Sequence, residues 1–186
     1  MAGPVTAAAA FIPPTAYPLL AEVNDSKKLS KKNRETLLTL MRASGVRFGF
    51  GFATPSEIDE VNILNATFRA MSRAAARLAA GLGAGPSDIL LLVDGPHKIR
   101  NFSFPQEAVV GGDGKSLSIA AASIFAKVIM DRWMAGLYRR WPGYGFAGHK
   151  GYGTRAHMSA LNALGPCPGH RLSYAPVRNA LAAGPA

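Results

Sequence analysis

Apolar and polar positions along the chain alternate between the repeat of a strand and the repeat of a helix. The apolar run Val5 to Ile12, ended by Pro13-Pro14, predicts a buried strand. Arg47 to Ala53 alternates with glycine, which predicts a strand that another backbone approaches closely. The continuous apolar run Ile89 to Val93 predicts a fully buried strand, and we expect a short strand at Glu107 to Val110.

Helical spacing and capping residues fill the intervals between these strands. Ser30 predicts the cap of a helix over about residues 31–43. A long helix is expected over Leu117 to Tyr138, and Thr154 predicts the cap of a last helix over about 155–164. Strands that alternate with helices indicate an α/β layer fold.

A further helix is expected between the strand at 47–53 and the one at 89–93. Ser56 with Asp59 resembles a capping box, with Asp in place of the usual Glu. One helical face is apolar: Val61, Leu64, Phe68, Met71, Ala75 and Leu78. Arg69, Arg73 and Arg77 form a separate stripe, which is more typical of a solvated face than of a binding surface.

Composition narrows the class of protein. The 186 residues suit one domain, and 48% apolar with 17% charged residues exclude a disordered chain. The single cysteine, Cys167, excludes a disulfide framework and a cysteine-rich zinc site, and it indicates a reducing, cytoplasmic environment. Residues 1–21 carry no charged side chain, but they have no basic start and contain four prolines. We therefore expect neither a signal peptide nor a membrane span.

The charge of the chain is strongly basic and unevenly distributed. Formal net charge is +10, and residues 132–186 contain no acidic residue. That stretch holds seven basic side chains: Arg132, Arg139, Arg140, Lys150, Arg155, Arg171 and Arg178. A polyanionic partner, nucleic acid before membrane, explains this bias. Composition alone equally allows a charge that only keeps the protein in solution.

Two carboxylates lie where an α/β fold can place a catalytic site. Asp94 follows the apolar run that predicts a strand, and Asp113 lies in a glycine-flanked turn before a helix. If they converge, they offer hard oxygen ligands that favour Mg²⁺ or Mn²⁺ over zinc. Spacing alone favours simpler roles, a strand-end turn residue for Asp94 and a helix-leading aspartate for Asp113.

The segment Tyr144 to His157 interleaves glycine, aromatic and basic residues. Lys150 and Arg155 can meet phosphates, and Tyr152 offers a flat ring to a sugar or base. The alternative is a glycine-rich surface loop whose aromatic residues pack inward.

The histidines and the cysteine of this region do not suggest a metal site or a nucleophile. His149, His157 and His170 lack zinc-finger spacing, and we interpret them as structural. Cys167 lies between two prolines with nothing near it that would activate a thiol.

Six separated motifs, in order, resemble bacterial ribonuclease HII over about residues 2–179. They are Asn24-Asp-Ser-Lys-Lys-Leu-Ser30, Glu57-Ile-Asp-Glu-Val-Asn-Ile-Leu64, Leu92-Val-Asp-Gly95, Gly112 to Lys127, Tyr144 to His157, and His170-Arg-Leu-Ser-Tyr-Ala-Pro-Val177. The resemblance implies a ribonuclease-H-like mixed sheet flanked by helices, with a helical C-terminal part. It divides the chain into a catalytic core at residues 1–140 and a basic substrate-binding part at 141–186.

The resemblance also implies an activity. Members cut on the 5′ side of a ribonucleotide in an RNA/DNA hybrid or a DNA duplex, with two divalent ions held by four acidic side chains. Asp94 and Asp113 match the third and fourth of these, and Asp131 is a weaker candidate ligand. Tyr152 matches the tyrosine that stacks on the deoxyribose following the ribonucleotide. Four basic residues become phosphate contacts: Lys27, Lys28, Lys150 and Arg155. We expect a monomer.

One departure from the family pattern concerns the first two metal ligands. The family opens with a strand that ends in Asp-Glu-Ala-Gly-Arg-Gly, whereas this chain begins Met1-Ala-Gly-Pro-Val5 and has no acidic residue before Glu22. We expect a truncated reading frame that lacks a central strand between Val5–Ile12 and the strand ending at Asp94, and little or no cleavage. The alternatives are a non-catalytic nucleic-acid binder and a small basic assembly protein.

Overall fold

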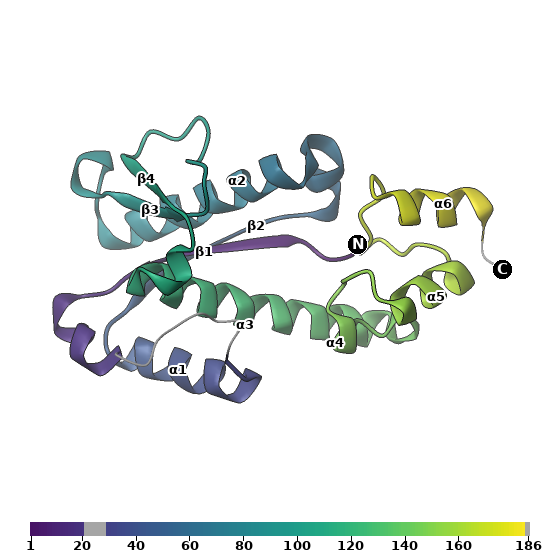
Figure 1. Cartoon of the computed structure of the whole chain (residues 1–186), viewed down its shortest axis with the longest axis horizontal. Coiled ribbons are helices and arrows are strands. Elements are labelled where there is room, and N and C mark those ends of the chain that lie inside the picture. The colour runs from purple at the N-terminus through teal and green to yellow at the C-terminus, as the bar shows by residue number, and fades with distance from the viewer. Residues whose placement is uncertain (21–28, 185–186) are drawn as a thin grey trace. The chain divides into compact units, whose positions relative to one another are not determined.

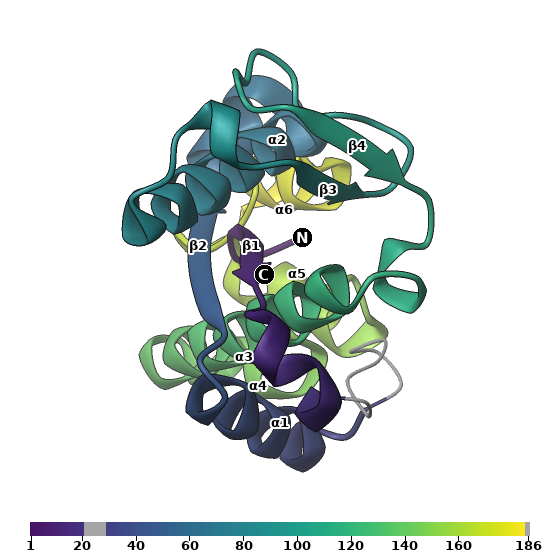
Figure 2. The same cartoon turned by 90° about the vertical axis from the view of Figure 1, so that its left-hand side faces the viewer.

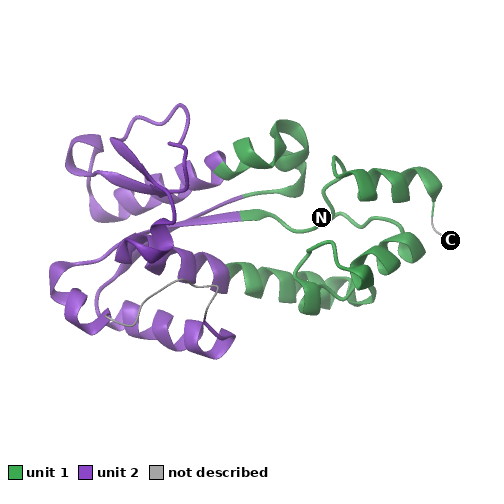
Figure 3. Ribbon diagram, in the orientation of Figure 1, with its two compact units in different colours: residues 1–5, 53–67, 129–186 green, residues 6–52, 68–128 purple. Residues whose placement is uncertain are grey.

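The computed structural model describes residues 1–20 and 29–184, and the chain divides into two compact units. One unit contains residues 1–5, 53–67 and 129–186, and the other contains residues 6–52 and 68–128 (Figure 3). Among the described residues, no helix is both long enough and apolar enough to cross a membrane.

In the described residues, four strands form two separate pairs. Strand β1 (Val5–Phe11) pairs with β2 (Arg47–Ala53), and β3 (Leu91–Asp94) pairs in parallel with β4 (Gln106–Val109) (Figures 1 and 2). All four lie within two residues of the positions predicted from the sequence, which confirms the α/β class. The expected single mixed sheet is instead two two-stranded sheets within the described part of the chain, and β1 and β3 share no hydrogen-bonded ladder.

Burial of two strands is lower than the apolar runs predicted. On β3 only Val93 is buried, whereas Leu92 keeps 41% of its surface exposed and the preceding Leu90 keeps 59%. On β1 only Ala7 is buried. A continuous apolar run was interpreted as a strand covered on both faces, but each strand here has one partner strand and one face that is incompletely covered.

Strand β2 shows why its sequence alternates phenylalanine with glycine. Successive side chains of a strand point to opposite faces. On one face Phe48 packs against Phe125 of α3 (Leu117–Arg140), with 4.6 Å between the ring centroids. On the other face a Cβ at Gly49 or Gly51 would overlap backbone oxygens of α2 (Pro55–Leu82). The glycines therefore let a helix lie directly on the strand, as the sequence predicted.

The helices begin and end close to the expected positions. Helix α1 (Lys31–Ala43) is capped by Ser30, whose Oγ accepts a hydrogen bond from the Asn33 N–H at 3.1 Å. The remaining helices are α3, α4 (Phe146–His149), α5 (Arg155–Leu164) and α6 (Ala175–Ala183). Helix α5 was expected to be the last, but α6 follows it. Short 3₁₀ helices span Pro14–Leu20, Pro86–Asp88, Gly112–Gly114 and Pro142–Tyr144.

The start of α2 differs from the predicted capping box. The box is formed two residues earlier, where the Thr54 N–H donates to Glu57 Oε2 at 2.9 Å and the Glu57 N–H donates to Thr54 Oγ1 at 3.2 Å. Asp59 instead accepts hydrogen bonds from the backbone N–H groups of Leu172 and Ser173, both at 2.8 Å. Both Thr-x-x-Glu and Ser-x-x-Asp fit the pattern, and Pro55 at the first helical position favours the earlier one.

The basic stripe of α2 also has a structural partner. Arg73 donates to the Phe52 carbonyl and Arg77 to the Phe50 carbonyl, each at 2.6 Å. These bonds satisfy main-chain acceptors of β2 that an isolated pair of strands would leave to water. Arg73 and Arg77 are both exposed, as the interpretation of the stripe as a solvated face predicted, but they also bond to the strand.

Candidate carboxylate pair and nucleic-acid interface

Asp94 and Asp113 lie at the same end of the β3–β4 pair. Asp94 is the last residue of β3, opposite Val109 in the parallel register. Its Oδ1 accepts a hydrogen bond at 2.9 Å from the backbone N–H of Gly112, the residue before Asp113. Because parallel strands end on the same edge, the segment that follows β4 returns beside the end of β3. The structure therefore places the backbone next to Asp113 against the Asp94 carboxylate.

The chemistry of this pair suits a hard divalent cation only as part of a larger ligand set. Carboxylate oxygens are the ligands that Mg²⁺ and Mn²⁺ prefer. Within residues 1–20 and 29–184, no three His, Cys, Asp or Glu side chains are grouped so that they could hold a metal ion. Asp94 and Asp113 thus fit such an ion in kind but supply two groups only.

The other candidate residues fall elsewhere. Asp131 is buried on α3 and already interacts with other groups of the chain. It belongs to the unit that contains residues 129–186, not to the unit of the carboxylate pair. Lys27 and Lys28 lie outside the described residues.

The loop from Lys150 to Thr154 presents one aromatic ring to solvent. Tyr152 is 70% exposed, although its N–H donates to the His149 carbonyl at 2.9 Å. Thr154 then caps α5, and its Oγ1 accepts a hydrogen bond from the His157 N–H at 3.3 Å. Arg155, the first residue of α5, is exposed, and Lys150 is half-buried. The loop therefore offers a ring and two cations on one short stretch of chain.

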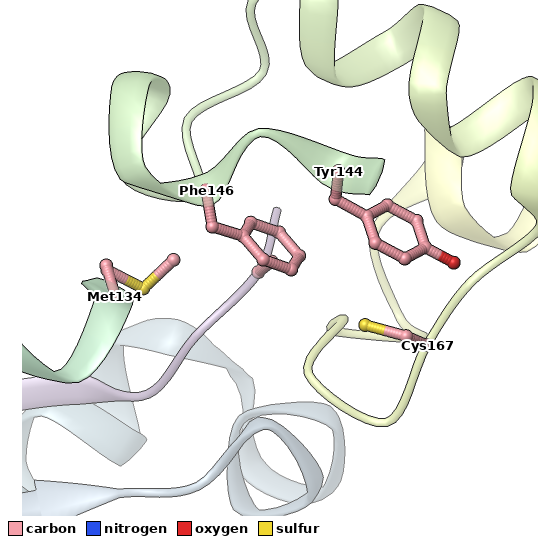
Figure 4. Packing of buried hydrophobic residues seen from close by; sticks show 5 residues of the cluster. Met134, Tyr144, Phe146 and Cys167 are labelled. Atoms are coloured by element: carbon pink, nitrogen blue, oxygen red, sulfur yellow. The ribbon is translucent and has the colours of Figure 1, made fainter. Parts of the chain in front are cut away.

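The other aromatic residues of this segment pack inward. Tyr144 and Phe146 are buried and stacked, with 5.3 Å between their centroids, and they pack with Met134 and Cys167 (Figure 4). The two interpretations of this segment thus apply to different residues, since Tyr144 and Phe146 belong to a core while Tyr152 does not. Burial raises the pKa of the Cys167 thiol, in agreement with the expectation that it is not an activated nucleophile.

Three histidines contact one another next to the loop that carries Tyr152. His157 and His170 are buried, and their Nε2 atoms are 3.0 Å apart. The ring of His149 stacks on His157 at 4.3 Å between centroids. Burial and the neighbouring His157 lower the pKa of His170 to about 4, and burial also lowers the pKa of His157. Both rings are therefore neutral at pH 7, which agrees with a structural role.

The sequence did not predict one hydrogen bond of this cluster, which joins His157 to the Tyr152 backbone. His157 Nδ1 lies 2.9 Å from the carbonyl oxygen of Tyr152, five residues earlier. The available signal was the cap at Thr154, because a capped helix start turns the chain back over the residues that precede it.

The comparisons with known proteins place the whole chain in one family. The sequence profile described as ribonuclease HII matches residues 1–177. The chain belongs to the ribonuclease HII family. A ribonuclease HII from Oleidesulfovibrio alaskensis is 47% identical over 202 residues, covering 98% of this chain and 77% of the relative. One from Rhodospirillum rubrum is 52% identical over 185 residues, covering 98% and 82%.

Solved structures support the ribonuclease-H-like fold. Ribonuclease H2 from Pyrococcus horikoshii superposes with a TM-score of 0.75 at 21% identity, covering 98% of this chain and 92% of that one. A ribonuclease HIII, Bst-RNase HIII, solved in complex with Mn²⁺ has a TM-score of 0.69 at 16% identity, covering 98% and 65%. A ribonuclease HII solved in complex with PCNA from Archaeoglobus fulgidus has a TM-score of 0.65 at 23% identity, covering 87% and 79%. Family and fold together make this chain a ribonuclease H type 2 protein, a class of nucleases.

Proposed function

We propose that this ribonuclease HII acts on the RNA strand of RNA/DNA hybrids and on single ribonucleotides embedded in duplex DNA. The cut falls on the 5′ side of the ribonucleotide and leaves a 3′-hydroxyl and a 5′-phosphate. The observation that supports the proposal is the hydrogen bond from the Gly112 N–H to the Asp94 carboxylate, because it joins Asp94 to the residue before Asp113, and both aspartates belong to motifs of the family.

Asp94 and Asp113 are proposed to hold divalent cations, Mn²⁺ or Mg²⁺. Such ions position an attacking water and stabilise the leaving oxygen of a phosphodiester. The two aspartates differ in their local surroundings. The Asp94 carboxylate also accepts the Gly112 N–H, which fixes the orientation of one oxygen, and Asp113 lies in the 3₁₀ helix that follows.

Binding of the duplex is assigned to residues 141–186, and residues 1–140 are assigned the catalytic role. Lys150 and Arg155 contact phosphates, and the exposed Tyr152 ring stacks on a sugar. Lys27 and Lys28 are proposed as further phosphate contacts. The absence of acidic residues from 132 to 186 favours this assignment, since no carboxylate there repels the phosphates.

We also propose that the chain of 186 residues cleaves weakly or not at all. The Asp-Glu pair that opens the family motif is absent from the sequence, and two carboxylates hold a pair of cations poorly. This favours a second candidate function, a nucleic-acid binder without catalysis.

A cleavage assay separates the two candidates. The chain, and a version extended at its N-terminus with Asp-Glu-Ala-Gly-Arg-Gly in the family's strand context, are incubated with Mn²⁺ or Mg²⁺ and a DNA duplex that contains one ribonucleotide. We expect the extended version to cut and the 186-residue chain to cut at least about a hundredfold more slowly, as loss of metal ligands implies.

The control for this assay is Asp94→Asn in the extended version. It keeps the side-chain oxygen that faces Gly112 but loses the negative charge, so it should abolish cleavage while duplex binding persists. If both versions are inert and both bind, the binder without catalysis is the correct function.

A further inference from the structure

A chain of hydrogen bonds runs from the loop at Cys167 through two buried histidines to the loop that carries Tyr152. The Cys167 N–H donates to His170 Nδ1 at 3.0 Å. His170 Nε2 lies 3.0 Å from His157 Nε2, and His157 Nδ1 lies 2.9 Å from the Tyr152 carbonyl oxygen. All of these residues belong to one compact unit.

The backbone groups at the two ends of this series of hydrogen bonds determine which ring nitrogens donate and which accept. At one end a backbone N–H can only donate, so His170 Nδ1 accepts and its proton lies on Nε2. At the other end a carbonyl oxygen can only accept, so His157 Nδ1 carries a proton and its Nε2 accepts. The two requirements agree, because His170 Nε2–H then points at the lone pair of His157 Nε2.

This arrangement holds only while both rings are neutral. A second proton on His157 would set its Nε2–H against the Nε2–H of His170, 3.0 Å away. A second proton on His170 would set its Nδ1–H against the Cys167 N–H, also 3.0 Å away, and both sites are buried. The Cys167 carbonyl lies 3.3 Å from His170 Nδ1 but already accepts the His170 backbone N–H at 2.9 Å. The lowered pKa values of both histidines agree with neutral rings.

The last of these hydrogen bonds ends on the backbone of Tyr152, whose ring is exposed. The Tyr152 carbonyl accepts from His157 Nδ1 and from the Thr154 N–H at 2.9 Å, while the Tyr152 N–H is bonded to His149. Both backbone polar groups of Tyr152 are thus held, although its side chain is 70% exposed. A ring on a fixed backbone loses less conformational freedom when it binds.

We propose that His157 and His170 are positioning residues, which hold the Tyr152 backbone so that its ring presents one fixed face to the nucleic-acid duplex. This proposal rests on the proposed function, in which Tyr152 stacks on a sugar of the bound strand. Neither histidine touches the duplex, and both act through Tyr152.

Two substitutions of His157 remove opposite halves of its hydrogen bonding. Asparagine places an N–H donor at the same number of bonds from the backbone as Nδ1, so His157→Asn can keep the bond to the Tyr152 carbonyl. Glutamine reaches the position of Nε2, so His157→Gln can accept from His170 but leaves Tyr152 without its donor. Both variants lose one buried hydrogen bond, and a role limited to stability would affect them alike.

The test is the effect of Tyr152→Ala on duplex affinity in three backgrounds. Affinity for a duplex with one ribonucleotide is measured with Ca²⁺ in place of Mg²⁺, which keeps the strand intact. Stacking on an aromatic ring predicts a loss of about tenfold in the wild type. We expect a similar loss with His157→Asn and less than about twofold with His157→Gln, where the ring is no longer held.

The outcomes distinguish the inference from the function on which it rests. An undiminished loss in His157→Gln overturns the positioning role alone. A loss below about twofold in the wild type overturns the proposed role of Tyr152, and the positioning role with it. Side-chain ¹⁵N spectra provide a direct check, since a proton on Nε2 of His157 at pH 7 would contradict the direction of the chain.

Discussion

At the scale of single residues, buried neutral histidines make this fold sensitive to acid. The pKa of His170 is lowered from 6.5 to about 4, first by burial and then by His157. Below pH 6.5 the unfolded chain therefore takes up a proton that the folded chain does not. The free energy of unfolding must fall as the pH drops from about 6.5 towards 4, because protons bind the unfolded state preferentially.

The pH dependence of unfolding tests this directly. Denaturant titrations between pH 7 and pH 5 should show a slope of at most about 1.4 kcal/mol per pH unit from this one group. His170→Asn keeps an acceptor for the Cys167 N–H but cannot titrate, so its curve should be flatter. Three other ionisable groups act on the His170 ring: His149, His157 and the amino group of Met1. An unchanged slope in His170→Asn would show that these, and not His170, control the response.

At the scale of elements, the packing of α2 on β2 depends on the absence of a side chain. A methyl group at Gly51 would overlap the carbonyl oxygen of Ala70, a backbone atom that cannot move without moving the helix. Gly51→Ala should therefore lower the free energy of unfolding by about 1–3 kcal/mol or more, as overpacking does. Thermal or chemical denaturation measures this loss.

A glycine of the same helix provides the matched control. Gly81 lies near the end of α2, and a methyl group there would have no atom of the described residues within 4 Å beyond its own stretch of helix. Gly81→Ala should raise the free energy of unfolding by about 0.5–1 kcal/mol, because alanine is the better helix former. A destabilised Gly81→Ala or an unaffected Gly51→Ala would contradict the role given to the β2 glycines.

The sequence predicted those elements whose signals are local. The cap at Ser30, the alternating β2 and the long α3 depend on neighbouring residues, and all three are observed. The kink at Asn62, where φ is 67° inside α2, was not predicted, since the side chains around it continue a helical pattern. The bond from Arg73 was not predicted either, because its partner, the Phe52 carbonyl, belongs to another element.

The same limit applies to the candidate site. Spacing could name Asp94 and Asp113 but could not show that the turn before Asp113 bonds to Asp94, because that depends on the parallel pairing of β3 with β4. The histidines could be interpreted as structural from their spacing. Their connection to Tyr152 could not be predicted, since it needs two loops to lie against one helix start.

At the scale of the whole molecule, the +10 charge should dominate affinity for a duplex. Each phosphate neutralised by a cation contributes about 0.9 to the slope of log affinity against log salt. Lys150→Gln with Arg155→Gln should therefore reduce that slope by about 1.8. Binding titrations over a series of salt concentrations measure it.

The control variant removes a charge outside the 141–186 segment. Arg47 donates to the Gly81 carbonyl, and Arg47→Gln should leave the slope nearly unchanged. A wild-type affinity that does not depend on salt would argue against nucleic acid as the partner of this basic segment.

The first five residues belong to the compact unit that also contains residues 129–186. The Gly3 N–H donates to the Gly169 carbonyl, and Arg171 Nε donates to the Gly3 carbonyl at 3.0 Å. Gly3 and Arg171 are 168 positions apart in the sequence, and a ribosome makes Gly3 first. Gly3 must therefore wait without these partners until the ribosome has added Arg171, and this unit can close only after that point.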